Sequence, residues 1–82
     1  MQVKAGIYRH YKGEYYVVVG EATHTETSAR MVVYHPLRDP TILWVRPAVM
    51  FFDEVAPHNY PGNQLHRFVP ATREEVLADA GE

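Results

Sequence analysis

Aromatic and basic side chains alternate near the start of the chain, and similar side chains recur at wider spacing further along it. Aromatic rings can stack on flat ligand groups, while Arg, Lys and His can bind phosphate or carboxylate groups. This combination suits an extended peptide, a nucleotide or a nucleic-acid strand. We therefore predict a ligand-binding surface, whose candidate residues are Tyr8, Arg9, His10, Tyr11, Lys12, His24, Glu26, Trp44 and Arg46.

The same residue types could serve catalysis. His10 or His24 would then act as the general base. Glu26 or Glu54 would orient that base, and Arg46 would stabilise an anionic transition state. The sequence has no nucleophile elbow, glycine-rich phosphate loop or paired-carboxylate motif. Binding is therefore favoured over catalysis, and no catalytic residue is assigned.

Five histidines raise the question of a metal site, because neutral imidazole is a common metal ligand. His24 and Glu26 lie two residues apart, which would place both on one side of a strand. The other histidines are scattered, and no spacing matches a zinc pattern. The absence of cysteine excludes a thiolate zinc site, a disulfide and a cysteine nucleophile. We therefore expect no metal and no cofactor.

The aromatic residues have a structural alternative. Rings also build the cores of small β proteins, with nearby arginines bonded to carboxylates or loop carbonyls. In this structural alternative the core would consist of Tyr16, Trp44, Phe51 and Phe68.

A third possibility is self-association, in which a sheet edge or the apolar segment 50–52 pairs with another copy to give a homodimer.

Length and composition indicate one folded domain over residues 1–82. A chain this short buries only about 60% of its unfolded surface, so it supports one small core. The formal net charge of −2 hides an asymmetry, because residues 1–13 carry three bases and no acid. Residues 74–82 carry four acids and no base. The basic opening can attract anions, although it is sparser than the basic stripe of a dedicated nucleic-acid binder.

The longest apolar runs are far too short to cross a membrane. Segments 15–19 and 48–52 are each five residues long, whereas a spanning helix needs about 20. The start of the sequence also lacks the apolar core of a signal peptide. We therefore expect a cytoplasmic protein that does not associate with membranes.

The pattern along the chain predicts mostly β-structure. Aromatic and β-branched runs bounded by turn residues predict strands. Pro47 favours one helical turn directly after it. The spacing of Thr72 and Glu75 matches a capping box, which predicts a short helix that ends near residue 80. Residues 56–66 are rich in turn formers and predict an irregular loop. The predicted strands cover residues 6–11, 15–23, 30–35, 42–46 and 67–69.

Five short strands with regular turn signals predict an all-β fold, namely a small antiparallel SH3-like barrel with a short C-terminal helix. An open meander sheet is the alternative. Side-chain alternation along the first strand means that one set of residues builds the core and the other is free to bind. The two sets are Ile7, Arg9 and Tyr11 on one face, and Tyr8, His10 and Lys12 on the other.

Several motifs in a fixed order resemble a known bacterial family. They run from the Gly6–Gly13 opening, through His24–Thr27 and Val32–Tyr34, to Trp44–Pro47 and Arg67–Phe68. This combination is similar to the family called domain of unknown function 1653, over residues 5–69. The resemblance implies a short, mainly β, SH3-like barrel, and it implies no reaction.

Overall fold

The computed structural model describes residues 3–80 and is mainly an antiparallel β-sheet. Short helices follow the fourth and fifth strands. This confirms the expected all-β class with a short C-terminal helix. In chain order the elements are β1 (Gly6–His10), β2 (Tyr15–Thr23), β3 (Arg30–Pro36), β4 (Trp44–Pro47), α1 (Ala48–Phe51), β5 (Phe68–Pro70) and α2 (Arg73–Ala80).

The five strands form an open sheet in the order β4-β3-β2-β1-β5. Each neighbouring pair is antiparallel, and the last strand returns to lie beside the first. In the described part of the chain, β4 and β5 stay unpaired with each other at the two edges, so the barrel does not close. These edge strands have only four and three residues, which limits the ladder that could join them.

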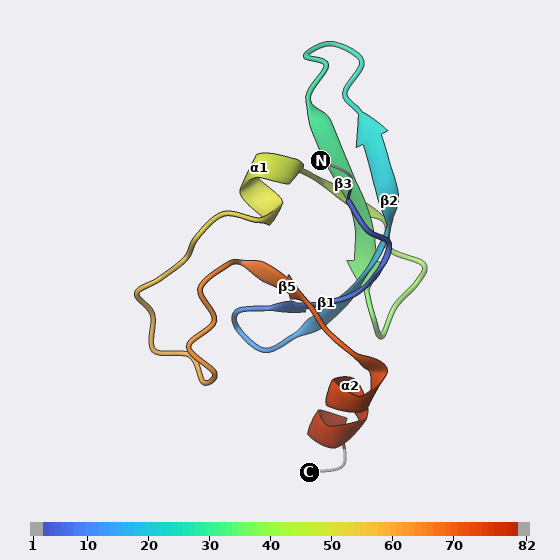
Figure 1. The fold of residues 1–82 in the computed structure, drawn as a ribbon. Helices are drawn as coiled ribbons and strands as arrows, with labels where there is room; N and C mark the ends of the chain where they lie inside the picture. Colours follow the sequence, from blue (N-terminus) through green and yellow to red (C-terminus); the bar gives the residue numbers. More distant parts are fainter. Residues whose placement is uncertain (1–2, 81–82) are drawn as a thin grey trace.

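The sheet bends at β2. Its first half pairs with β1, while the whole strand pairs with β3, and the register shifts between Val18 and Gly20. Such an irregularity bends a strand and increases its twist. Figure 1 shows the consequence: β1, with β5 next to it, lies beside the first half of β2, whereas the second half of β2 continues upward with β3 as a long hairpin. The inner face of this bent sheet, defined as the face that carries Tyr8 and Tyr34, is therefore concave.

An aromatic core fills the inner face. Its centre is Phe51 of α1, which stacks on Phe68 of β5 with ring centroids 4.0 Å apart. Tyr34 meets both rings edge to face, an arrangement that adds about 0.5–1.5 kcal/mol per pair beyond burial. The buried hydrophobic residues of this core are Tyr8, Val18, Val32, Tyr34, Phe51 and Phe68.

Several boundaries differ by a few residues from the sequence expectation. The fourth strand begins at Trp44 and not at residue 42, because hydrogen bonds to Asp39 extend the preceding turn. The Thr41 amide and hydroxyl donate to the Asp39 carboxylate, and the Ile42 amide donates to the Asp39 carbonyl. The first strand ends at His10, where the His10 amide donates to the Glu14 carbonyl and closes the β1–β2 turn.

The remaining segments follow the expected chemistry. The capping box forms, since the Glu75 amide donates to the Thr72 hydroxyl and the Thr72 amide donates to the Glu75 carboxylate, both at 3.1 Å. Residues 56–66 are an irregular loop. None of the helices within residues 3–80 has the length and apolar character needed to cross a membrane.

Candidate functional site

Sheet register places several of the predicted binding residues on the inner face. Tyr8 and His10 alternate onto it from β1, because Tyr8 pairs with Tyr16 and His10 pairs with Phe68. On β4, Trp44 is opposite Tyr34, and Arg46 is opposite Val32. These side chains thus share the face that holds the core. Tyr8 is only 4% exposed and belongs to that core, with its hydroxyl donating to the Lys4 carbonyl.

A continuous row of aromatic rings runs from the 56–66 loop across the sheet to β4. We call these residues the ring row: Tyr60, Tyr11, His10, Tyr16 and Trp44. Successive ring centroids in that order are 5.5, 4.6, 6.1 and 6.2 Å apart. Tyr60 and Trp44, at the two ends, are 40% and 43% exposed, whereas the three inner rings are half-buried. The row therefore offers open rings at its ends and a packed support between them.

Cationic side chains lie along the ring row. The Lys12 ammonium is 5.9 Å from the ring centroids of both Tyr11 and Tyr60. The Arg67 guanidinium lies 5.8 Å from the Tyr11 centroid. Arg46, from β4, is close enough to lower the pKa of His10. Positive charge over ring faces is favourable, and positive charge in general attracts anionic groups.

His10 is the central ring and is neutral near pH 7. Burial lowers the pKa of His10 from its usual value, and the positive charges of Arg67, Lys12 and Arg46 lower it further. The carboxylate of Glu14 acts in the opposite direction and raises this pKa, but the net shift is downward. Its Nδ1 accepts a hydrogen bond of 3.2 Å from the Lys12 amide. A neutral imidazole that accepts through Nδ1 carries its proton on Nε2. His10 can therefore donate from Nε2.

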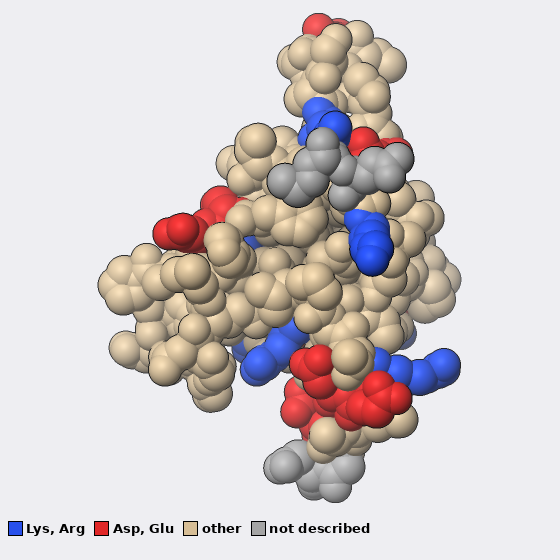
Figure 2. Space-filling view, in the orientation of Figure 1, with Lys and Arg blue, Asp and Glu red and all other residues tan. Residues whose placement is uncertain are grey.

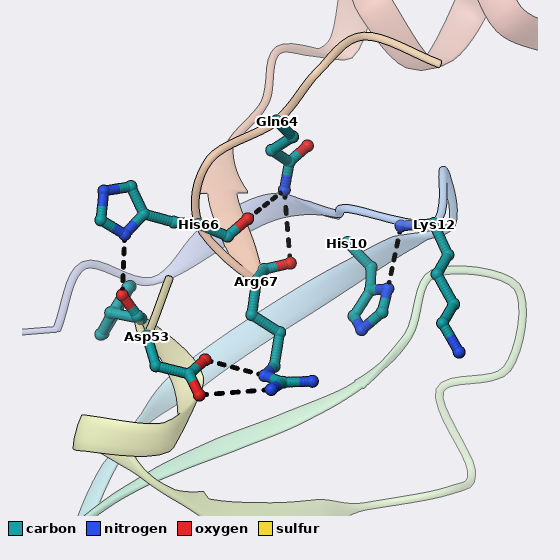
Figure 3. Close-up of polar contacts among 7 residues, drawn as sticks. His10, Lys12, Asp53, Gln64, His66 and Arg67 are labelled. Carbon is teal, nitrogen blue, oxygen red and sulfur yellow. Dashed lines mark hydrogen bonds and ion pairs between the residues drawn. The ribbon is translucent and has the colours of Figure 1, made fainter. Parts of the chain in front are cut away.

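Arg67 is held beside His10 by Asp53, as Figure 3 shows. Its Nε and Nη2 donate to the two carboxylate oxygens of Asp53 at 2.8 and 3.2 Å. These hydrogen bonds lower the pKa of Asp53, and a paired geometry of this kind fixes the guanidinium plane. The side-chain amide of Gln64 donates to the carbonyls of His66 and Arg67, which holds the 56–66 loop against the backbone next to Arg67.

A hollow of about 390 Å³ lies at the Trp44 end of the ring row. Its volume is near the lower limit of typical small-ligand sites, which span roughly 300–1,000 Å³. The rings of Tyr16 and Trp44 form part of its wall, and the charged side chains at its border are of both signs. It is lined by Glu14, Tyr15, Tyr16, Pro36, Leu37, Arg38 and Trp44.

The structure separates other predicted residues from this surface. Arg9 projects on the opposite side of β1, where its guanidinium packs against the backbone of Gly62. His24 and Glu26 belong to the β2–β3 turn, and the Glu26 amide donates to Nδ1 of His24 at 3.1 Å. His24 is eight positions beyond Tyr16, which amounts to roughly 26 Å along a strand. Within residues 3–80, no three His, Asp or Glu side chains converge on a possible metal position.

Sequence reasoning missed part of the surface. Tyr16, Tyr60, Asp53 and Gln64 were absent from the candidate set, and Arg67 was considered only as a structural partner of carboxylates or carbonyls. Its carboxylate partner is Asp53, fourteen residues away in sequence. Such a pairing has no local signal. The available signal for Tyr16 was its position directly opposite Tyr8 in the predicted hairpin.

Comparison with known proteins places the chain in a family. The family described as a protein of unknown function, DUF1653, matches residues 6–70. A crystal structure of a DUF1653 protein from Bordetella bronchiseptica shares 30% sequence identity with this chain and superposes with a TM-score of 0.69. That match covers 84% of this chain and 87% of the other. No curated protein matches the chain. The family match confirms the resemblance expected from the sequence motifs, and the chain belongs to the DUF1653 family.

Proposed function

We propose that this protein is a binding module whose ligand lies along the ring row and combines a flat ring with an anionic group. The observation that carries the proposal is the continuity of the row, in which five rings contact one another in sequence beside Lys12, Arg46 and Arg67. Rings supply stacking surface, and the cations supply phosphate or carboxylate contacts.

The hydrogen-bonding groups along the row favour an anion over a cation. Arg46 and Lys12 carry only donors, and His10 presents an Nε2 donor. The Asp53 carboxylate is already engaged by Arg67. A ligand with acceptor oxygens therefore satisfies more of this surface than a ligand with ammonium groups.

The SH3-like description of the fold remains part of the proposal. Its support is the meander order in which β5 returns beside β1, together with a bent β2 shared by both halves of the sheet. The helical turn α1 lies between the last two strands and inserts Phe51 where a closed barrel would be filled. This geometry leaves the Trp44 end of the inner face open for a ligand.

The experiment is a ¹⁵N–¹H NMR titration with adenosine 5′-monophosphate, with adenosine and ribose 5-phosphate as probes that lack either the anion or the base. We expect shifts at the His10 and Tyr11 amides and at the Trp44 indole, with weaker effects from each partial probe. Arg46→Gln should weaken binding of the monophosphate. Arg73→Gln is the matched control, because Arg73 lies in α2, outside the ring row. Absence of shifts at millimolar ligand, or shifts confined to other elements, contradicts the proposal.

A second candidate function is self-association through the β4 edge. Leu43 and Val45 are 63% and 60% exposed next to the unpaired side of β4. Exposed edge strands with apolar side chains are templates for pairing with another chain. Light scattering should then give a dimer mass that Val45→Lys converts to a monomer. A monomer at every concentration excludes this candidate and leaves the binding proposal intact.

A further inference from the structure

We infer that the ring row binds a short single strand of nucleic acid, an inference that rests on the proposed function above. A mononucleotide supplies one base and one phosphate. The ring row offers more than one base and one phosphate can occupy. Three features favour a longer ligand, namely the exposed rings at the two ends of the row, the distribution of charge and the state of His10.

The two exposed rings pack on different neighbours, since Tyr60 contacts Tyr11 and His58 whereas Trp44 contacts Tyr16 and Tyr34. Tyr60 and Trp44 are the two ends of the row, with Tyr11, His10 and Tyr16 between them. Every step between neighbouring ring centroids is at least 4.6 Å. In the inferred complex one base stacks at Trp44 and another at Tyr60, and the intervening nucleotides pass over the half-buried rings. Stacking of successive bases on aromatic side chains is the usual basis of sequence-tolerant single-strand binding.

Charge along the row complements a phosphate backbone. Lys12 and Arg67 lie beside the Tyr60 end. At the other end, Arg38 borders the hollow at Trp44 together with Glu14. Arg46, on the same face of β4 as Trp44, is close enough to His10 to lower its pKa. Cations are thus present near both exposed rings. Much of the acidic charge gathers elsewhere, and Figure 2 shows acidic side chains clustered over α2 at the lower end of the molecule. A repeating polyanion matches this distribution better than an uncharged proline-rich peptide, which would offer Lys12 and Arg46 no anionic partner.

The neutral state of His10 fits the same ligand. A neutral imidazole at the middle of the row can contact a base without placing an additional charge in the half-buried centre. Its Nε2 donor can bind a base acceptor or a phosphate oxygen. The centre of the row therefore supplies a ring and a donor, while its flanks supply the charges.

The test is fluorescence anisotropy with a 5′-labelled eight-nucleotide oligo-dT, with competition by unlabelled ligands. The competitors are an eight-base-pair duplex, thymidine 5′-monophosphate, an eight-residue polyproline peptide and an eight-residue polyglutamate peptide. We expect the oligonucleotide to bind at least tenfold more tightly than the mononucleotide and more tightly than the duplex or either peptide. If three cations contact phosphates, the logarithm of the binding constant should fall with the logarithm of salt concentration with a slope of about −2.

Variants locate the strand on the row. Trp44→Ala and Tyr60→Ala should each reduce affinity by about 5- to 150-fold, the range for loss of one stacked base. Lys12→Gln and Arg46→Gln should reduce affinity and make the salt slope shallower. Arg73→Gln is the charge-matched control, which should change the affinity by less than about twofold and leave the salt slope unchanged. Circular dichroism of each variant separates lost binding from lost folding.

The outcomes distinguish this inference from the proposed function. Mononucleotide binding at the ring row without a gain from chain length overturns the single-strand inference and leaves the binding module standing. Tighter binding of either peptide than of the oligonucleotide also overturns the inference and identifies a peptide ligand. Failure of the oligonucleotide, the mononucleotide and both peptides to bind overturns both.

Discussion

His10 connects the core of the protein to its charged surface. Its ring packs against Phe68 at 4.9 Å and against Tyr11 at 4.6 Å, so it bridges a buried ring and an outer one. Arg67 approaches from the other side, where Asp53 holds it. A single imidazole is thus surrounded by apolar surface and positive charge. Both surroundings oppose its protonation.

This environment predicts an acidic shift in the titration of His10. Its pKa should be below 6.5 because of burial first and the nearby cations second. Replacing Arg67 by glutamine removes the largest of the cationic effects and should raise the pKa of His10, whereas Arg73→Gln should not change it. The measurement is NMR titration of the imidazole carbon-bound protons. A His10 pKa above 6.5 in the wild-type protein contradicts the description of the site.

The same shift has a consequence for stability with a definite sign. Because the folded state has the lower His10 pKa, the unfolded state binds more protons just below pH 6.5. The contribution of neutral His10 to stability is complete above pH 6.5 and falls as the pH decreases toward the folded pKa. Urea unfolding of the wild type and of His10→Gln should therefore show a difference in stability that narrows between pH 7 and pH 5.5.

Residue types in the sequence predicted part of this surface, because His10, Tyr11 and Trp44 belong to the ring row and Lys12 and Arg46 lie beside it. Alternation predicted that β1 divides into two faces. It could not say which face is buried, since both carry an aromatic residue and a base. Only the pairing with β2 and β5 decides this, and it places Tyr8 in the core.

Among the elements, the 56–66 loop depends on a glycine at position 62. Any side chain there would strain the backbone and crowd the guanidinium of Arg9. Gly62 has φ near +93°, and a Cβ there would lie 3.2 Å from Nη1 of Arg9. Gln64 adds a hydrogen bond of 3.0 Å to the Arg9 carbonyl of β1. The loop that carries Tyr60 thus contacts β1 through both the side chain and the carbonyl of Arg9.

Gly62→Ala should destabilise the protein by about 1–2 kcal/mol, the typical cost of a left-handed conformation with a Cβ. The matched control is Gly20→Ala. Gly20 has no neighbouring heavy atom within 4 Å of the added carbon, and alanine in a strand is about 0.5–1 kcal/mol better than glycine. Urea unfolding measures both. Equal effects of the two substitutions would show that the loop does not depend on this contact.

Element positions were largely predictable because aromatic runs, prolines and the capping box are local signals. The hairpins β1–β2 and β2–β3 and the helix α2 all follow from such signals. Closure of the sheet is a long-range property, and the sequence could not decide between a barrel and an open meander. The short β4 and β5, and the insertion of Phe51 against Phe68, favour the open form.

For the molecule as a whole, charge and packing are separated in space. The acidic helix α2 buries none of its described side chains. It contacts the sheet through Tyr15, whose hydroxyl donates to the Asp79 carboxylate. Burial first, and the hydrogen bond to Asp79 second, raise the pKa of Tyr15 to about 12. The core and the ring row involve other elements. If the ring row binds a ligand as proposed, the helix should influence that ligand mainly through its charge.

Removal of residues 72–82 tests this separation. The segment contains one base and four acids, so the formal net charge changes from −2 to +1. Because α2 covers no core residue, the thermal midpoint of the remaining chain should fall only slightly, by a few degrees at most. If the ring-row ligand is a nucleic-acid strand, its affinity should increase severalfold in 10 mM salt, where the Debye length is about 30 Å. The gain should disappear near 1 M salt, where the Debye length is about 3 Å.

Two outcomes would contradict this prediction. A gain in affinity that persists at high salt would indicate that α2 blocks the ligand by contact and not by charge. Loss of the cooperative thermal transition would show that α2 is required for the fold.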